Sequence, residues 1–388
     1  MVDQRLAAGV LAALLAGIVL GYLALGGGGA TVTSTEYRPT TVTVTAEKTV
    51  VSTATRLSTT TVTQTVVTST VVSTVATTTV TETLPVEKLV LVDALGRTVT
   101  MEKPAGRVVS LAPSVTEEIV MLNESSKLVG ADSFSKNIPG VPANVTDVGG
   151  YWNPSPEKII QTRPDLVLAC NGVPAQERLA GQLESAGLKV FFTRCDRSRD
   201  WSDIEWDVEA IGRLLGAAEA ADRLVAWMEN QLATLKSELV NATRPTLALV
   251  VYLQDKGAWI AGGGTFQDTL VETAGARNVF SNLYGWQMVS YEDILSRNPA
   301  YIVVTTMGGP EAANKTLEKL AASPIAETGA WKNGHVCIAY GDLVDALSRP
   351  SPRAVLAAQA LAALLHPDRV EKPASLGGWF LCNEPSQG

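Results

Sequence analysis

The same helix-then-strand pattern occurs twice in this chain. EKIIQTRPDLVLA begins at Glu157 and EDILSRNPAYIVV begins at Glu292, with equal spacing from Glu to Pro. A capping serine stands just before each helix, and Pro164 and Pro299 end the helices ahead of apolar, β-branched runs. Each copy therefore predicts a helix leading into a buried strand, and the repetition predicts two related α/β lobes.

Strand and helix signals also alternate around both copies, in residues 85–203 and 242–388. In RVVSLAPSVTEE a buried strand precedes a helix, for which Ser114 and Glu117 are predicted to form a capping box. Residues 204–241 contain no strand signal, and their apolar side chains recur at helical spacing. The predicted fold class is α/β, with two Rossmann-like lobes of mostly parallel sheet joined by a long connecting helix.

The N-terminal residues differ from the rest. LAAGVLAALLAGIVLGYLAL, within residues 1–29, carries no charge and is about long enough to span a bilayer. Arg5 before it favours an outside location for the remaining chain, although a cleaved signal peptide is an alternative. Residues 30–84 are rich in Thr, Ser and Val, which predicts an extended, O-glycosylated stalk or else a β-rich fibre. We expect an extracellular protein anchored at the cell membrane.

The net charge and the cysteines limit the possible partners and the location of the protein. The net charge of −8 and the lack of a Lys/Arg cluster exclude a nucleic-acid partner. The four cysteines form no CxxC motif, so disulfides are expected outside the membrane. Cys170 and Cys195 each end an apolar run and can bridge if those strands are neighbours, which leaves Cys337 and Cys382. Four Asn-x-Ser/Thr sequons also suit an exported glycoprotein.

Enzymatic motifs are missing from the sequence. No GxxxxGK[ST], HExxH or GxSxG occurs, which argues against an ATPase, a zinc protease and a serine hydrolase. His335 and His366 have no ligand spacing, and both are expected at the surface. We therefore expect no catalytic activity, no bound metal ion and no resident cofactor.

Four blocks carry a family resemblance: RVVSLAPSVTE, NPSPEKIIQTRPDLVLA, VSYEDILSRNPAYIVV and RPSPRAVLAAQAL, in this order around the helical connector. Residues 88–367 resemble the class III periplasmic substrate-binding proteins of ABC importers, which bind cobalamin, ferric siderophores or haem. The resemblance implies a rigid connecting helix, a ligand cleft between the lobes and modest closure. It also implies that Glu157 and Glu292 pair with arginines of the permease dimer, which works with an ATPase. Alternatively, each Glu only complements its helix dipole.

Aromatic residues are the first candidates for ligand contacts. Tyr151 and Trp286 have the same spacing from the two glutamates, and the cobalamin-binding relative has Trp at both positions. Aromatic faces can stack on a corrin or a haem, although interlobe packing is the alternative role. Trp152 follows Tyr151, and Trp259 is expected in a loop after the strand TLALVVYL.

Polar candidates come from two further segments. Asn171 follows the strand that ends at Cys170. In GDLVDALSRPSPR, Asp342 and Arg349 approximate an Asp and an Arg at the cleft of the relative, although this loop is longer here. An arginine suits carboxylates of haem or a siderophore as well as corrinoid amides.

The expected function is capture of a metal chelate by a monomeric binding protein, which delivers it to an ABC importer. A cobalamin-like corrinoid is the favoured ligand, and a ferric siderophore or haem is the alternative. A surface adhesion protein or a sensory ectodomain, each with a Thr-rich stalk, remains a different class of function.

Overall fold

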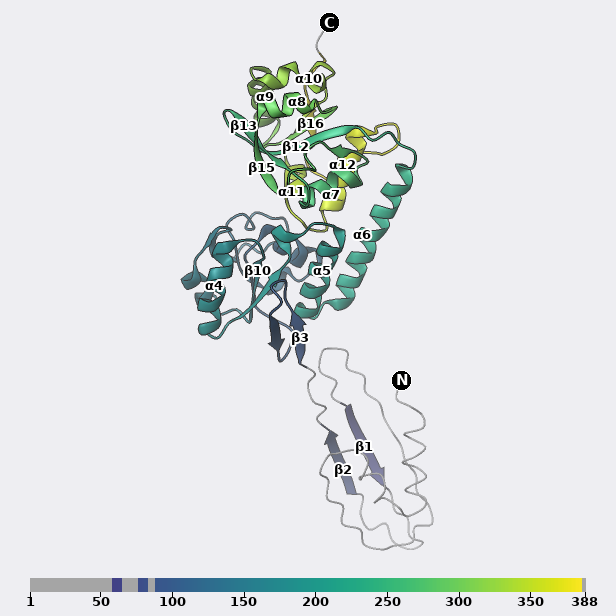
Figure 1. Cartoon of the computed structure of the whole chain (residues 1–388). Coiled ribbons are helices and arrows are strands. Elements are labelled where there is room, and N and C mark those ends of the chain that lie inside the picture. The colour runs from purple at the N-terminus through teal and green to yellow at the C-terminus, as the bar shows by residue number, and fades with distance from the viewer. Residues whose placement is uncertain (1–57, 65–75, 83–87, 386–388) are drawn as a thin grey trace. The chain divides into compact units, whose positions relative to one another are not determined.

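The computed structural model describes residues 58–64, 76–82 and 88–385 (Figure 1). The chain forms two compact units, residues 1–85 and 86–388. In the first unit, β1 (Ser58–Gln64) and β2 (Ala76–Glu82) pair antiparallel. The predicted membrane span and most of the predicted stalk lie outside the described residues. Among the residues that are described, no helix is both long and apolar enough to cross a membrane.

The N-terminal lobe contains a five-stranded parallel sheet, as the alternating pattern predicted. Its strand order is β11 (Lys189–Thr193), β10 (Leu166–Cys170), β5 (Val108–Ser110), β6 (Leu128–Ala131) and β7 (Thr146–Asp147). The helices of this lobe are α2 (Pro113–Met121), α3 (Pro156–Gln161) and α4 (Pro174–Ser185). Two short antiparallel pairs complete it: β3 (Leu89–Val92) with β4 (Thr98–Met101), and β8 (Gly149–Gly150) with β9 (Asn153–Pro154).

The capping box predicted for α2 is wrong. The N-cap residue is Ala112, which has no side-chain cap, and Ser114 lies inside the first turn. Ser114 instead contacts the sulfur of Cys195, and Glu117 contacts residues of the other lobe. Both side chains therefore contact residues distant in the sequence instead of forming the capping box that their spacing suggested.

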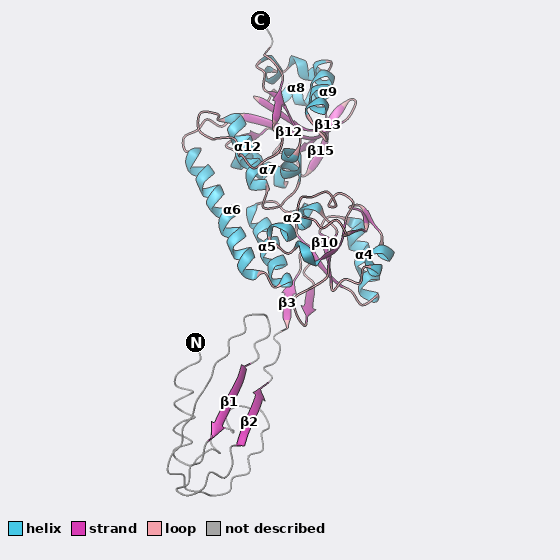
Figure 2. Cartoon of the chain, turned by 180° about the vertical axis from the view of Figure 1, so that it is seen from behind, coloured by secondary structure: helices cyan, strands magenta, loops and turns pink. Residues whose placement is uncertain are grey.

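The connector consists of two helices, α5 (Trp201–Leu215) and α6 (Ala218–Glu238). Gly216 ends α5 in the left-handed conformation, with φ of 73°, which a glycine adopts without strain. Ala221 at the start of α6 belongs to the core of the N-terminal lobe, whereas Met228 and Leu235 belong to the core of the C-terminal lobe. Figures 1 and 2 show α6 running along both lobes, so this single helix fixes them to each other.

The C-terminal lobe contains a seven-stranded mixed sheet. Three central strands are parallel: β12 (Thr246–Leu253), β16 (Tyr301–Thr305) and β17 (Val336–Ala339). Three more are antiparallel: β13 (Gly257–Ala261) and β15 (Trp286–Ser290) beyond β12, and β18 (Phe380–Cys382) beside β17. β14 (Arg277–Asn278) pairs with β12. Trp259 and Trp286 thus lie in strands, whereas the sequence placed Trp259 in a loop.

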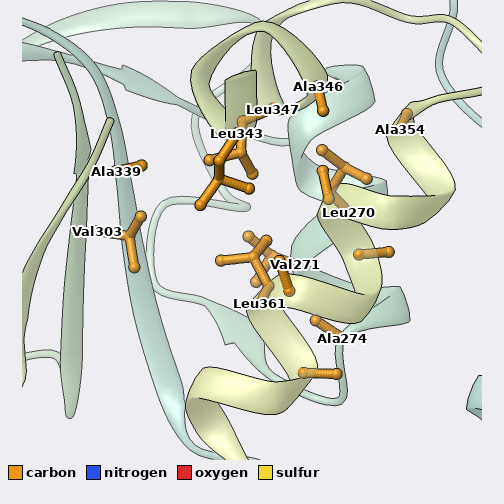
Figure 3. Close-up of a cluster of buried hydrophobic side chains, with 14 of the residues drawn as sticks. Leu270, Val271, Ala274, Val303, Ala339, Leu343, Ala346, Leu347, Ala354 and Leu361 are labelled. Carbon is orange, nitrogen blue, oxygen red and sulfur yellow. The ribbon is translucent and has the colours of Figure 1, made fainter. Parts of the chain in front are cut away.

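Helices cover both faces of this sheet. One face carries α7 (Phe266–Thr273), α11 (Asp342–Ser348) and α12 (Ala354–Leu365), and the other carries α8 (Tyr291–Arg297), α9 (Pro310–Ala321) and α10 (Gly329–Lys332). Figure 3 shows Leu270, Leu343 and Leu361 in one buried cluster with Val303 and Ala339 of the sheet. The many alanines of α12 let it approach α7 and α11 closely, which holds α11 at the cleft.

Both predicted disulfides are present. Cys170–Cys195 joins the ends of the neighbouring strands β10 and β11. Cys337–Cys382 joins directly opposite residues of β17 and β18.

Candidate functional site

A cavity of about 840 Å³ lies between the two lobes of residues 86–388. Its walls include segments that follow β5, β6 and β11 in one lobe, and the carboxyl-terminal residues of β12 and β16 in the other. This is where ligands bind in open α/β sheets, so the cavity lies where the sequence predicted a cleft.

Four of the predicted ligand residues line this cavity: Tyr151, Trp152, Trp286 and Arg349. The N-terminal wall also includes Ser114, Phe134, Cys195 and Asp196. The C-terminal wall also includes Tyr252, Thr306, Met307, Lys319 and Asp345. The cavity therefore combines aromatic faces from both lobes with a few polar and charged groups, as small-molecule sites usually do.

Trp152, rather than Tyr151, presents an open aromatic face. Trp152 is 67% exposed, and Phe134 and Tyr151 each meet it edge-on, with ring centroids 6.1 and 5.0 Å away. Tyr151 is only 8% exposed, so its ring supports the indole. The sequence predicted ligand contacts for both Tyr151 and Trp152 but could not tell which ring is exposed in the cavity.

The floor of the cavity contains Cys195, which is bonded to the buried Cys170, and the groups around this disulfide. The Tyr151 hydroxyl donates to the Cys170 sulfur at 2.9 Å, and the Ser114 hydroxyl lies 3.5 Å from the Cys195 sulfur. Burial, and secondarily the nearby Asp196 carboxylate, raises the pKa of Tyr151 far above its ordinary value. Burial also raises the pKa of Asp196. Tyr151 is therefore a neutral donor and not a phenolate.

A buried ion pair joins the lobes beside this floor. Glu117 of α2 is 1% exposed, and its Oε1 accepts from Arg349 Nη1 at 2.7 Å and from Arg353 Nη1 at 3.0 Å. Its Oε2 accepts from the Ser351 hydroxyl at 2.6 Å. The partners lie 232 to 236 residues away along the chain. No local spacing could have identified Glu117 as a site residue.

Asp345, unlike Glu117, lines the cavity, and the sequence did not single it out. It lies one turn before Arg349 on the segment that forms α11, and its Oδ1 is 2.8 Å from Arg349 Nη2. Burial raises the pKa of Asp345, while the Arg349 guanidinium acts in the opposite direction. The sequence pattern predicted a loop for this segment. It therefore did not predict that Asp345 and Arg349, four residues apart, would pair as neighbours on a helix.

Three predicted ligand residues do not line the cavity. The Asn171 side-chain amide donates to the Ala94 carbonyl at 3.2 Å. Trp259 lies in β13 opposite Tyr252, which does line the cavity. Asp342 is exposed in the first turn of α11. Their predicted contacts with a ligand stay predictions.

Among the described residues, metal-ligating side chains do not gather in the cavity as they would at a metal site. Within the described residues, one group of potential ligands is close enough, Cys170, Cys195 and Asp196, and its two sulfurs are bonded to each other. The histidines lie elsewhere: His335 stacks on Tyr301, and His366 is buried, which corrects the expectation that it lies at the surface.

The two predicted docking glutamates occupy equivalent positions in the two lobes. Glu157 and Glu292 are exposed in the first turns of α3 and α8. Ser155 and Ser290 cap these helices, as predicted, by accepting from the backbone N–H groups of Lys158 and Asp293. The repeated sequence pattern is thus one structural unit, present once per lobe.

Comparison with known proteins agrees with this architecture. Residues 108–342 match the family model described as periplasmic binding protein. An uncharacterized ABC transporter substrate-binding lipoprotein of Bacillus subtilis, YvrC, is 30% identical over 71% of this chain and 85% of its own length. A cobalamin-binding protein of Halobacterium salinarum is 27% identical over 68% of this chain and 70% of its own.

Solved structures share the fold. A periplasmic heme-binding protein from Pseudomonas aeruginosa superposes with a TM-score of 0.60 at 22% identity, over 73% of this chain and 100% of that one. The chain therefore belongs to the periplasmic binding protein family, as a class III substrate-binding protein of ABC importers.

Proposed function

We propose that the protein captures a cobalamin-like corrinoid in the interlobe cavity and delivers it to the permease of an ABC importer. The observation that carries the proposal is the pair of indoles, Trp152 and Trp286, which line one cavity from opposite lobes. Two aromatic faces on separate lobes suit a flat macrocycle held between them. The cobalamin-binding relative supports the same ligand class.

Haem is the second candidate, because two cationic side chains, Lys319 and Arg349, line the cavity and could meet two carboxylates. An axial ligand for iron is harder to find among the described residues. Tyr151 is held neutral by burial, and Met307, which is exposed at the wall, offers a thioether. These features favour a chelate that brings its own axial ligands, as cyanocobalamin does.

Delivery is proposed to use Glu157 and Glu292, whose exposed carboxylates arginines of a permease dimer could reach. The N-terminal apolar span is proposed to anchor the protein on the extracellular face of the membrane, with the Thr-rich residues as a spacer.

The test of ligand capture uses residues 86–388, a compact unit of the chain. The protein is incubated with cyanocobalamin, freed of unbound ligand by gel filtration and examined by visible spectroscopy. A corrin spectrum at one ligand per protein is expected. If the protein peak is colourless after incubation with cyanocobalamin but coloured after incubation with hemin, the assigned ligand changes from a corrinoid to haem.

A further inference from the structure

The positive charge of Arg349 is compensated where it reaches the cavity. Its two terminal nitrogens contact different carboxylates, Nη1 that of Glu117 at 2.7 Å and Nη2 that of Asp345 at 2.8 Å. Arg353 shares Glu117, at 3.0 Å. Two arginines thus meet two carboxylates, and only 15% of the Arg349 side chain is exposed.

The other basic side chain among the described lining residues is also paired. Lys319 Nζ lies 3.3 Å from an Asp255 carboxylate oxygen. The lining also contains two acids, Asp196 and Asp345. Among its described lining residues, the cavity therefore offers an incoming anion no cation without an acidic partner, and the lining carboxylates repel an anion.

Hydrogen-bond capacity nevertheless remains on Arg349. A guanidinium has five N–H groups, and the carboxylates engage two of its three nitrogens. A neutral carbonyl oxygen can accept a remaining N–H while both ion pairs stay intact. A ligand carboxylate can accept the same N–H, but it adds a third negative charge beside Glu117 and Asp345. It can form a full ion pair with Arg349 only by displacing one of these acids, which leaves that acid without its partner.

We propose that Asp345 and Glu117 determine specificity by compensating Arg349, so that the cavity prefers chelates bearing neutral carboxamides over chelates bearing carboxylates. This inference rests on the proposed function, that the cavity holds a macrocyclic chelate. It assigns the discrimination to the charge partners of Arg349 rather than to the arginine itself.

The test compares ligands that differ by one group. Cyanocobalamin and each monocarboxylate made by hydrolysing one side-chain amide are titrated into the full-length chain, and hemin serves as a dianionic macrocycle. The wild type is compared with Asp345→Asn. The control is Asp368→Asn, which removes an aspartate that is also paired with an arginine, Arg369, but lies outside the cavity.

The wild type is expected to bind cyanocobalamin about tenfold tighter than at least one monocarboxylate isomer. Asp345→Asn should remove most of this difference in affinity, because it should bind the monocarboxylate more tightly. Asp368→Asn should show the same difference in affinity as the wild type. A wild type that prefers hemin or the monocarboxylates, or a difference in affinity that Asp345→Asn leaves unchanged, overturns the specificity assignment while ligand capture stands. Failure to bind any of these compounds overturns both proposals.

Discussion

Glu118 is completely buried in α2, and neither of its carboxylate oxygens has a hydrogen-bond partner within the described chain. Burial, then the charges of Asp207 and Glu117, raises its pKa well above the ordinary value. Asp207 of α5 is also buried, and its oxygens accept the backbone N–H groups of Arg194 and Cys195 at 2.7 and 3.0 Å. Burial raises the pKa of Asp207 to about 7. Asp207 therefore supports the loop at the cavity floor, and Glu118 is a second buried acid whose charge interacts with it.

The sign of the pH dependence follows from these raised pKa values. In the unfolded chain both acids release their protons near pH 4, at about the ordinary carboxyl pKa. Between about pH 4 and the raised folded pKa values, about 7 for Asp207, the folded protein binds protons that the unfolded chain has lost. The contribution of these groups to stability is present at low pH and is lost as the pH rises through the folded pKa values.

Glu118→Gln is therefore expected to flatten the stability profile. The variant should match the wild type near pH 4 and exceed it by about 1–3 kcal/mol at pH 8, because an amide need not be kept protonated in the core. Denaturant unfolding at several pH values measures this, with the exposed Glu371→Gln as the control. If Glu118→Gln destabilises the protein equally at every pH, the acid does not titrate as described.

At the scale of elements, the sequence predicted the parallel strands and most helices because their hydrophobic periodicity is local. It missed β13 and β15, which have five residues each, and α11, which has seven residues. α11 forms because Leu343 and Leu347 pack against α7 and α12 (Figure 3). That tertiary contact turns Asp345 toward Arg349, so the aspartate suggested by resemblance, Asp342, is not the one that lines the cavity.

The two disulfides stabilise different parts of the fold. Each closes a loop, of 25 and 45 residues, and each is expected to stabilise the fold by about 3–4 kcal/mol. Only Cys170–Cys195 contacts cavity groups, Tyr151 and Ser114, among the described residues. Cys337–Cys382 instead fastens the last strand to the sheet.

Replacing both members of the first pair by Ser should lower the melting temperature and weaken cyanocobalamin binding about tenfold, because the cavity floor relaxes. The same change at Cys337 and Cys382 should lower the melting temperature but leave affinity unchanged. Calorimetric titration below both melting temperatures separates the effects. Equal losses of affinity in the two variants would mean that both disulfides only stabilise the fold and that neither has a specific role in the cavity.

At the scale of the whole binding unit, several contacts oppose hinge motion. α6 is packed into the cores of both lobes, and Glu117 ties α2 to the C-terminal lobe. The Trp201 indole N–H also donates to the Thr273 hydroxyl at 3.0 Å, from the connector to α7. These contacts connect residues far apart in the sequence, which is why composition and spacing could predict the two lobes but not how tightly they are joined. Such a rigid molecule fits the prediction of modest closure.

A rigid binding protein keeps Glu157 and Glu292 at a fixed separation, so a permease dimer with matching arginines can engage both at once. Replacing both glutamates by Ala is expected to leave cyanocobalamin affinity unchanged, because neither residue lines the cavity. The same variant should no longer stimulate the ATPase of the reconstituted importer. The matched control is Glu219→Ala with Glu311→Ala, which removes two exposed glutamates from the first turns of α6 and α9. Stimulation by the Glu157/Glu292 variant equal to that of the control would mean that these carboxylates serve only their own helix dipoles.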